Sequence, residues 1–197
     1  MKEKIMFFDV ETTGLPGDHN APYTNTNNWP RIVSIAWAIT DSRGKQLDEH
    51  YSLVKPDGFE IPTAAERVHG ISTAQAMAEG TALYDIFSLL QETLTDYDVG
   101  KLVAHNMSFD RNVLFCEFVR VEHSLPSFMS PSPTVCTMKS STDFCAIPGR
   151  YDSYKWPTLE ELHRKLFHES PSGQHNALYD VRATMACYFE LVHLGLL

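Results

Sequence analysis

The feature that most constrains this chain is a buried strand that ends in acidic residues. The apolar run Ile5–Phe8 predicts a β-strand over Ile5–Val10, and Asp9 and Glu11 come at its end. Residues i and i+2 of a strand project to the same face, so the two carboxylates would be neighbours. Two anions beside an apolar run repel each other and lose hydration unless a cation bridges them. The alternative is a strand end that emerges into solvent, where both carboxylates are simply hydrated.

Further strands and helices follow along the chain. Strands are predicted over Ile32–Ile39, over Gln46–Val54 after a type I turn at Asp41–Gly44, and over Leu102–Ala104. Apolar residues recur at helical spacing in four segments, which are Leu83–Leu94, Val113–Val121, Leu159–Leu166 and Leu178–Val192. The helix at Leu159 follows a capping box at Thr158–Glu161, and a short strand is expected near Val135. Early strands that are later interleaved with helices indicate an α/β fold with a mixed sheet.

Length and composition fit one domain over residues 1–197. The chain has 43 % hydrophobic and 21 % charged residues, which is ordinary for a globular protein with a full core. Its formal net charge of −9 counts against a basic face that grips a nucleic-acid duplex, because such binding depends on Lys and Arg. The sequence has no apolar segment of membrane-spanning length, and its four cysteines lack metal-site spacing. We therefore expect a cytoplasmic protein with reduced thiols and no membrane partner.

A second acidic cluster lies at His105–Asp110, where a predicted strand ends and a helix begins. Binding sites of α/β sheets gather at the carboxyl ends of strands, and Asp110 would fall there if this strand runs parallel to the first. The alternative is that Asn106 or Ser108 caps the helix and Asp110 favours its N-terminal dipole.

A third cluster, His175–Asp180, adjoins the last predicted helix, which begins near Asn176. On a continuous helix, His175 and Asp180 would lie roughly 140° apart, so they share a site only if His175 precedes the helix. The alternatives are a solvent-exposed loop histidine and a first-turn aspartate that favours the helix dipole.

Together the clusters supply oxygen-rich ligation from four carboxylates: Asp9, Glu11, Asp110 and Asp180. That chemistry suits Mg²⁺ or Mn²⁺ rather than zinc or copper. Two such ions about 4 Å apart can clamp the attacking and leaving oxygens of a phosphoryl displacement. A single histidine without further metal-binding partners is suited to take a proton from the attacking water.

These segments resemble the motifs of a known family. Phe8–Leu15, Ala104–Asp110 and the H-x-A-x-x-D pattern of His175–Asp180 are similar to the three motifs of the DEDDh 3′–5′ exonucleases. This family is the DnaQ-like type of the DNA polymerase III proofreading subunit, within the ribonuclease H-like superfamily. Val68–Ser72 is also similar, and the resemblance extends over residues 5–194. It implies a ribonuclease H-like fold, with a central five-stranded mixed sheet flanked by helices and two metal ions over the sheet.

The resemblance also implies a role for each matching residue. Asp9, Glu11 and Asp180 resemble direct metal ligands, Asp110 resembles a fourth acid that often binds the metal through water, and His175 resembles the general base. Thr12 matches a position that lines the terminal nucleotide, Leu15 one that wedges against its base, and Asn106 is expected to bind substrate as well.

The resulting hypothesis is a two-metal 3′–5′ exonuclease that releases nucleoside monophosphates from single-stranded or frayed ends. DNA is favoured as substrate with RNA as the alternative, and a DNA polymerase or replication protein is a candidate partner. The competing hypotheses are a non-catalytic DnaQ-like module that binds nucleic acid or a polymerase, and an acidic binding domain with solvated carboxylates. Two long segments, 16–30 and 124–157, are expected to be mainly loop. Tyr23 and Trp29 of the first could stack on a base, or Trp29 could pack on the second strand.

Overall fold

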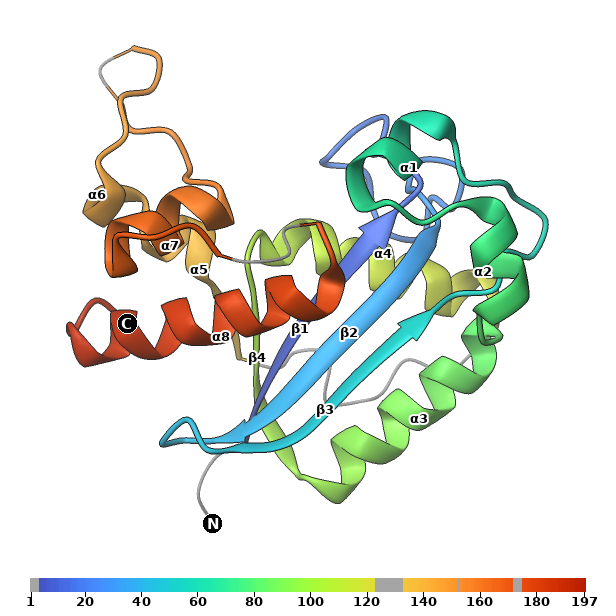
Figure 1. Ribbon diagram of the computed structural model, residues 1–197, viewed down its shortest axis with the longest axis horizontal. Helices are drawn as coiled ribbons and strands as arrows, with labels where there is room; N and C mark the ends of the chain where they lie inside the picture. Colours follow the sequence, from blue (N-terminus) through green and yellow to red (C-terminus); the bar gives the residue numbers. More distant parts are fainter. Residues whose placement is uncertain (1–3, 123–132, 152, 172–174) are drawn as a thin grey trace.

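A five-stranded sheet forms the centre of the computed structural model, which describes residues 4–122, 133–151, 153–171 and 175–197 (Figure 1). The strand order is β3-β2-β1-β4-β5. The bounds are β1 Lys4–Thr12, β2 Ile32–Asp41, β3 Gln46–Leu53, β4 Val99–Ala104 and β5 Thr134–Cys136. Strand β1 pairs antiparallel with β2 and parallel with β4, and β4 pairs parallel with β5. The predicted α/β class and five-stranded mixed sheet are therefore confirmed.

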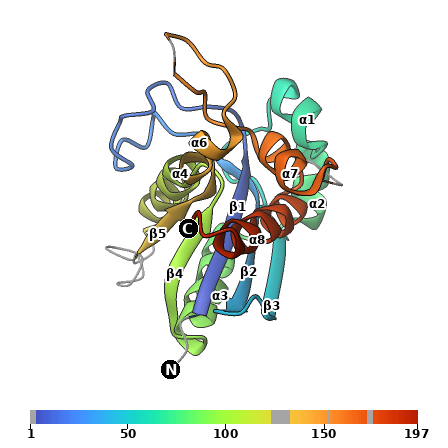
Figure 2. The same ribbon diagram turned by 90° about the vertical axis from the view of Figure 1, so that its left-hand side faces the viewer.

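Helices cover both faces of this sheet. The helices of the described residues are α1 Thr63–His69, α2 Thr73–Glu79, α3 Leu83–Asp96, α4 Met107–Arg120, α5 Thr137–Ser140, α6 Thr142–Cys145, α7 Leu159–Phe167 and α8 Ala177–His193. Helices α3 and α4 pack on one face, and α8 crosses the other face in front of β1 (Figures 1 and 2). Within the described part of the chain, helices are too short or too polar to traverse a lipid bilayer.

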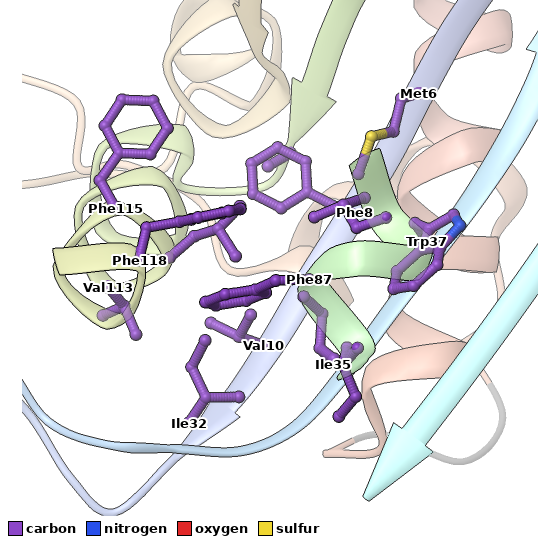
Figure 3. Close-up of a cluster of buried hydrophobic side chains, with 14 of the residues drawn as sticks. Met6, Phe8, Val10, Ile32, Ile35, Trp37, Phe87, Val113, Phe115 and Phe118 are labelled. Carbon is purple, nitrogen blue, oxygen red and sulfur yellow. The ribbon is translucent and has the colours of Figure 1, made fainter. Parts of the chain in front are cut away.

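The alternation of side chains along β1 decides which layer each residue enters. Met6, Phe8 and Val10 point into the core under α3 and α4, where the rings of Phe87 and Phe118 stack at 3.9 Å (Figure 3). Ile5 and Phe7 point into the second core, under α8. Asp9 and Glu11 continue this second series, so the strand delivers both carboxylates to the α8 face.

The long segment between β1 and β2 is held in place by contacts with α4. The Arg120 guanidinium, at the end of α4, donates hydrogen bonds to the carbonyl oxygens of Thr26, Trp29 and Pro30. Trp29 is only 4 % exposed, and Tyr23 packs edge-on against Phe115. Of the two alternatives for Trp29, the structure therefore shows packing in the core, and Tyr23 packs against the same core while remaining half-buried.

Other differences from the sequence-based expectations have local causes. Helices α1 and α2 were not predicted, since each buries a single residue and shows no apolar repeat. Thr81 is a plausible N-cap by sequence for the helix predicted from Leu83, but it does not cap α3. Its backbone pairs with Leu53 and Lys55 at the end of β3, and Ala82 takes the cap position. In the segment 124–157, β5 is the strand predicted near Val135, and the described residues 146–151 and 153–157 lie outside helices and strands, as expected. The short helices α5 and α6 were not predicted, and 124–132 lie outside the described residues.

Candidate active site

Three carboxylates from two elements converge above the sheet. Asp9 and Glu11 come from the end of β1, and Asp180 comes from the first turn of α8. One oxygen of each lies within 4.8 Å of the oxygens of the other two. The alternation of side chains along β1 places Asp9 and Glu11 on one face, and the start of α8 above that face adds Asp180. These two features bring the three acids together.

Asp110 lies behind this trio, in the first turn of α4. Its Oδ1 accepts a hydrogen bond of 3.3 Å from the backbone N–H of Val10, and the residue is only 3 % exposed. Because β4 runs parallel to β1, the helix that follows β4 begins beside the carboxyl end of β1. Asp110 was expected beside the first strand only if the two strands run parallel, and they do.

Burial and mutual repulsion raise the pKa values of these acids. Burial, with a further contribution from Asp180, raises the pKa of Glu11 to about 7. Burial raises the pKa of Asp180 to about 6. Burial and then the charges of Asp110, Asp180 and Glu11 raise the pKa of Asp9 well above its usual range. A cluster of desolvated carboxylate oxygens is the donor set that a hard divalent cation neutralises best, so the residues present fit Mg²⁺ or Mn²⁺.

His175 precedes the helix, as a shared site with Asp180 requires. It is exposed and has a left-handed backbone with φ of 63°, and α8 begins two residues later, at Ala177. Its backbone N–H donates a 3.1 Å hydrogen bond to Oδ2 of Asp180. A cavity of about 300 Å³ opens beside this turn, and its lining comprises Asp9, His105, Thr158, Leu159, Glu160, Pro171, His175 and Asp180.

The three residues expected to bind substrate lie around the ends of β1 and β4. The Thr12 hydroxyl donates to the carbonyl oxygen of Gly14, and Leu15 is 76 % exposed. Asn106 has a left-handed backbone with φ of 73° at the start of α4, and its Oδ1 accepts a hydrogen bond from the Ser108 hydroxyl. In the described part of the chain, none of these three residues lines the 300 Å³ cavity.

His105 lines the cavity although its role was not predicted from the sequence. Its Nε2 lies 3.1 Å from the carbonyl oxygen of Pro157, and its Nδ1 lies 3.0 Å from the Thr137 hydroxyl. A carbonyl oxygen only accepts, so Nε2 carries the proton. Burial lowers the pKa of His105 to about 4, which keeps the ring neutral. The available signal was its position directly after the predicted strand, within the second acidic cluster.

Comparison with known proteins gives a family and a set of similar folds. The family model described as Exonuclease (RNase T) matches residues 6–188. Comparison with curated proteins gives no match by sequence. Among solved structures, the zinc-bound complex of Escherichia coli exonuclease I with single-stranded DNA is 22 % identical with a TM-score of 0.76, over 98 % of this chain and 41 % of that chain.

Two further solved structures show the same similarity. E. coli exonuclease I in complex with a dT13 oligonucleotide is 23 % identical with a TM-score of 0.75, over 97 % of this chain and 41 % of that one. A product-bound structure of exonuclease I is 20 % identical with a TM-score of 0.75, over 100 % of this chain and 45 % of that one. The chain thus spans less than half the length of these proteins, and the similarity concerns the fold.

The family assignment rests on the sequence match rather than on the fold. The matched residues 6–188 include all three acidic motifs, and the structure brings their side chains to one end of the sheet. The chain therefore belongs to the exonuclease family, which confirms its resemblance to the DEDDh exonucleases of the ribonuclease H-like superfamily.

Proposed function

We propose that this chain is a metal-dependent 3′–5′ exonuclease that releases nucleoside monophosphates from single-stranded or frayed nucleic acid, with DNA favoured. The observation that carries the proposal is the convergence of Asp9, Glu11 and Asp180 into one cluster of carboxylates. Asp9 and Asp180 of this cluster line one cavity together with His175. Membership of the exonuclease family supports it. So does the fold that the chain shares with exonuclease I structures solved with single-stranded DNA.

Asp9, Glu11 and Asp180 would hold two Mg²⁺ or Mn²⁺ ions. Asp110, which accepts a hydrogen bond from the backbone of Val10, would contribute as the fourth acid, through water. Bound divalent ions supply charge neutralisation at the scissile phosphate and lower the pKa of water. The protein needs such cations because its own site presents only negative charge to a negatively charged substrate.

His175 would accept the proton from the attacking water. The water oxygen then forms a bond to the terminal phosphorus, and the bond from phosphorus to the 3′-oxygen of the preceding nucleotide breaks. The released mononucleotide keeps the phosphate on its 5′ carbon, and the leaving 3′-oxygen takes up a proton from solvent, which gives the shortened strand a 3′-hydroxyl. Oδ2 of Asp180 accepts the backbone N–H of His175, so this hydrogen bond positions the histidine next to a metal ligand.

The competing hypothesis of a non-catalytic DnaQ-like module is disfavoured by the site itself. Such a module has no need for an intact acid set, yet all five expected catalytic residues are present, and Asp9, His175 and Asp180 line one cavity. We also propose that residues 1–197 form one domain, because the described helices pack around one sheet. A DNA polymerase or replication partner remains a proposal that rests on the resemblance to proofreading subunits.

The test is digestion of DNA and RNA oligonucleotides that carry a label at either the 5′ or the 3′ end. With Mg²⁺ or Mn²⁺, the 3′ label is expected to appear at once in mononucleotides, while the 5′-labelled strand shortens stepwise. Chelator is expected to stop both, and Asp180→Ala should do the same. Undiminished cleavage in chelator, or products shortened from the 5′ end, would contradict the proposal.

A further inference from the structure

An exposed tryptophan lies two residues before Thr158, which lines the proposed catalytic cavity. Trp156 is 59 % exposed, whereas the next residue, Pro157, is buried. The carbonyl oxygen of Pro157 accepts a hydrogen bond from Nε2 of His105, which lines the cavity, and Thr158 lines the cavity as well. Consecutive Cα atoms are about 3.8 Å apart, so the Trp156 backbone lies within about 8 Å of a residue that faces the proposed reaction site.

The backbone that carries Trp156 is held in place on its other side too. Lys155 donates its N–H to the carbonyl oxygen of Ile147, and Gly149 donates its N–H to the carbonyl oxygen of Ser153. A Cβ at Gly149 would come within 2.7 Å of the Ser153 oxygen, so this close pairing of the two backbones requires glycine. Figure 1 shows this orange segment, between α6 and α7, projecting away from the sheet. The tryptophan ring is therefore displayed on a fixed support.

A cation accompanies the ring. Nζ of Lys139, in α5, lies 5.3 Å from the Trp156 ring centroid, and among the described residues it makes no ion pair with a carboxylate. Lys155 differs, because its ammonium pairs with Glu161 of α7 at 2.5 Å. Tyr154, two residues before Trp156, forms an isolated antiparallel bridge with Pro148. Tyr154 is 51 % exposed.

We propose that Trp156, together with Lys139, is a stacking platform for the single strand on the 5′ side of the scissile phosphate. This inference rests on the proposed function, since it places the 3′-terminal nucleotide in the cavity and requires the rest of the strand to leave across its rim. Every base has a π-face on which an indole can stack, and a lysine ammonium matches the charge of the adjacent phosphate. An acidic protein needs such a local site, because its net charge of −9 repels the strand elsewhere.

The experiment compares two substrates that differ in whether they reach the platform. One is a dT10 oligonucleotide, and the other is the p-nitrophenyl ester of thymidine 5′-monophosphate, which has a scissile phosphodiester but no upstream nucleotide. The ratio of kcat/KM for dT10 to kcat/KM for the ester is expected to fall about tenfold in Trp156→Ala, through KM for dT10. Trp156→Phe keeps a stacking ring and should stay within about threefold of wild type. Lys139→Ala should show a smaller fall that vanishes at high salt.

The matched control is Lys45→Ala, an exposed lysine in the turn between β2 and β3, at the other end of the sheet. It should leave the ratio unchanged. An unchanged ratio in Trp156→Ala would overturn the platform, and would indicate that the ring receives another partner, such as a protein segment. An equal loss on both substrates would also overturn it, because the tryptophan would then support the cavity itself.

A binding measurement keeps the two proposals separable. Trp29 and Trp37 are 4 % and 0 % exposed, so quenching of tryptophan fluorescence by added dT10 reports mainly on Trp156. We expect quenching in wild type and about tenfold weaker dT10 binding, measured with a labelled oligonucleotide, in Trp156→Ala. If wild type cleaves neither substrate but shows this binding pattern, the exonuclease proposal fails and the platform stands. Equal dT10 binding by both proteins would overturn the platform whatever the activity.

Discussion

The backbone N–H of His175 donates a 3.1 Å hydrogen bond to Oδ2 of Asp180, which ties the proposed base to a proposed metal ligand. The bond closes a turn at the start of α8, and His175 reaches it with a left-handed φ of 63°. Oδ2 of Asp180 therefore accepts a hydrogen bond from the turn, while the same carboxylate also belongs to the acidic cluster with Asp9 and Glu11. Movement of the turn would change the position of both catalytic groups together.

Loss of the His175 imidazole is expected to lower kcat by roughly 10²–10⁴, the usual range for a general base, without loss of metal binding. Steady-state kinetics of His175→Ala would measure this. His175→Asn is the matched control, since asparagine tolerates the left-handed backbone better than alanine does. If either variant keeps near-normal kcat at neutral pH, His175 is not the base.

Stability of the metal-free protein should fall as the pH rises from about 4.5 to 7. Glu11 has a folded-state pKa of about 7 against an ordinary value of 4.5, so in this window the folded state binds the proton more tightly than the unfolded state does. Each pKa unit corresponds to about 1.4 kcal/mol, and each kcal/mol to about 2–4 °C in Tm for a chain of this size. Calorimetry in chelator should show this slope, and Glu11→Gln should flatten it.

Divalent cations should reverse that loss. At pH 7.5, Mn²⁺ is expected to raise Tm, and at pH 5 it should raise Tm less, because protonated carboxyl groups are poor ligands. Equal stabilisation at both pH values would show that the ions bind elsewhere.

Asp9→Asn is expected to abolish turnover and Mn²⁺ binding while raising the Tm of the metal-free protein at pH 7.5. The substitution removes one of several mutually repelling, desolvated charges, which is why the pKa of Asp9 is raised so far. Asp96→Asn, at an exposed carboxylate at the end of α3, should change neither quantity. A lower Tm for Asp9→Asn in the absence of metal would contradict this account of the site.

Arg120 is expected to be a major support of the segment between β1 and β2. It bonds the carbonyl oxygens of Thr26, Trp29 and Pro30 and pairs with the buried carboxylate of Glu117 at 3.0 Å. Glu117 keeps a second partner in the variant, because Nε of Arg31 lies 2.8 Å from the same carboxylate oxygen. The cost of Arg120→Ala therefore comes mainly from the carbonyl oxygens that lose their donor. An unpaired buried acceptor costs about 1–3 kcal/mol, and the free energy of unfolding in urea titrations should fall by about that amount.

The control is Arg182→Ala, which breaks an ion pair with Glu49 at the surface. Exposed pairs contribute about 0–1 kcal/mol, so this variant should unfold almost as wild type does. Equal losses in the two arginine variants would show that the hydrogen bonds of Arg120 to the segment between β1 and β2 do not make it a major support.

Local patterns were enough to predict much of the fold and most of the site. The alternation along β1 placed Asp9 and Glu11 on one face, and the capping box at Thr158–Glu161 is formed as predicted. Asn176 caps α8, so His175 lies just before the helix as the third motif required. These features depend on residues a few positions apart, and the physical rules that govern them act at that range.

Contacts between distant residues decided the rest. The place of Asp110 beside Val10 depends on the parallel pairing of β1 with β4, which no local pattern specifies. The sequence left open whether Trp29 stacks on a base or packs in the protein. Its burial in the core accompanies a hydrogen bond from the Arg120 guanidinium to its carbonyl oxygen, a contact between residues far apart in the chain. The hydrogen bond from His105 to Pro157 places an exposed Trp156 beside the cavity. The sequence by itself thus determined which side chains are the candidates for the chemistry, whereas only tertiary packing decided which surfaces surround them, because packing joins residues that lie tens of positions apart.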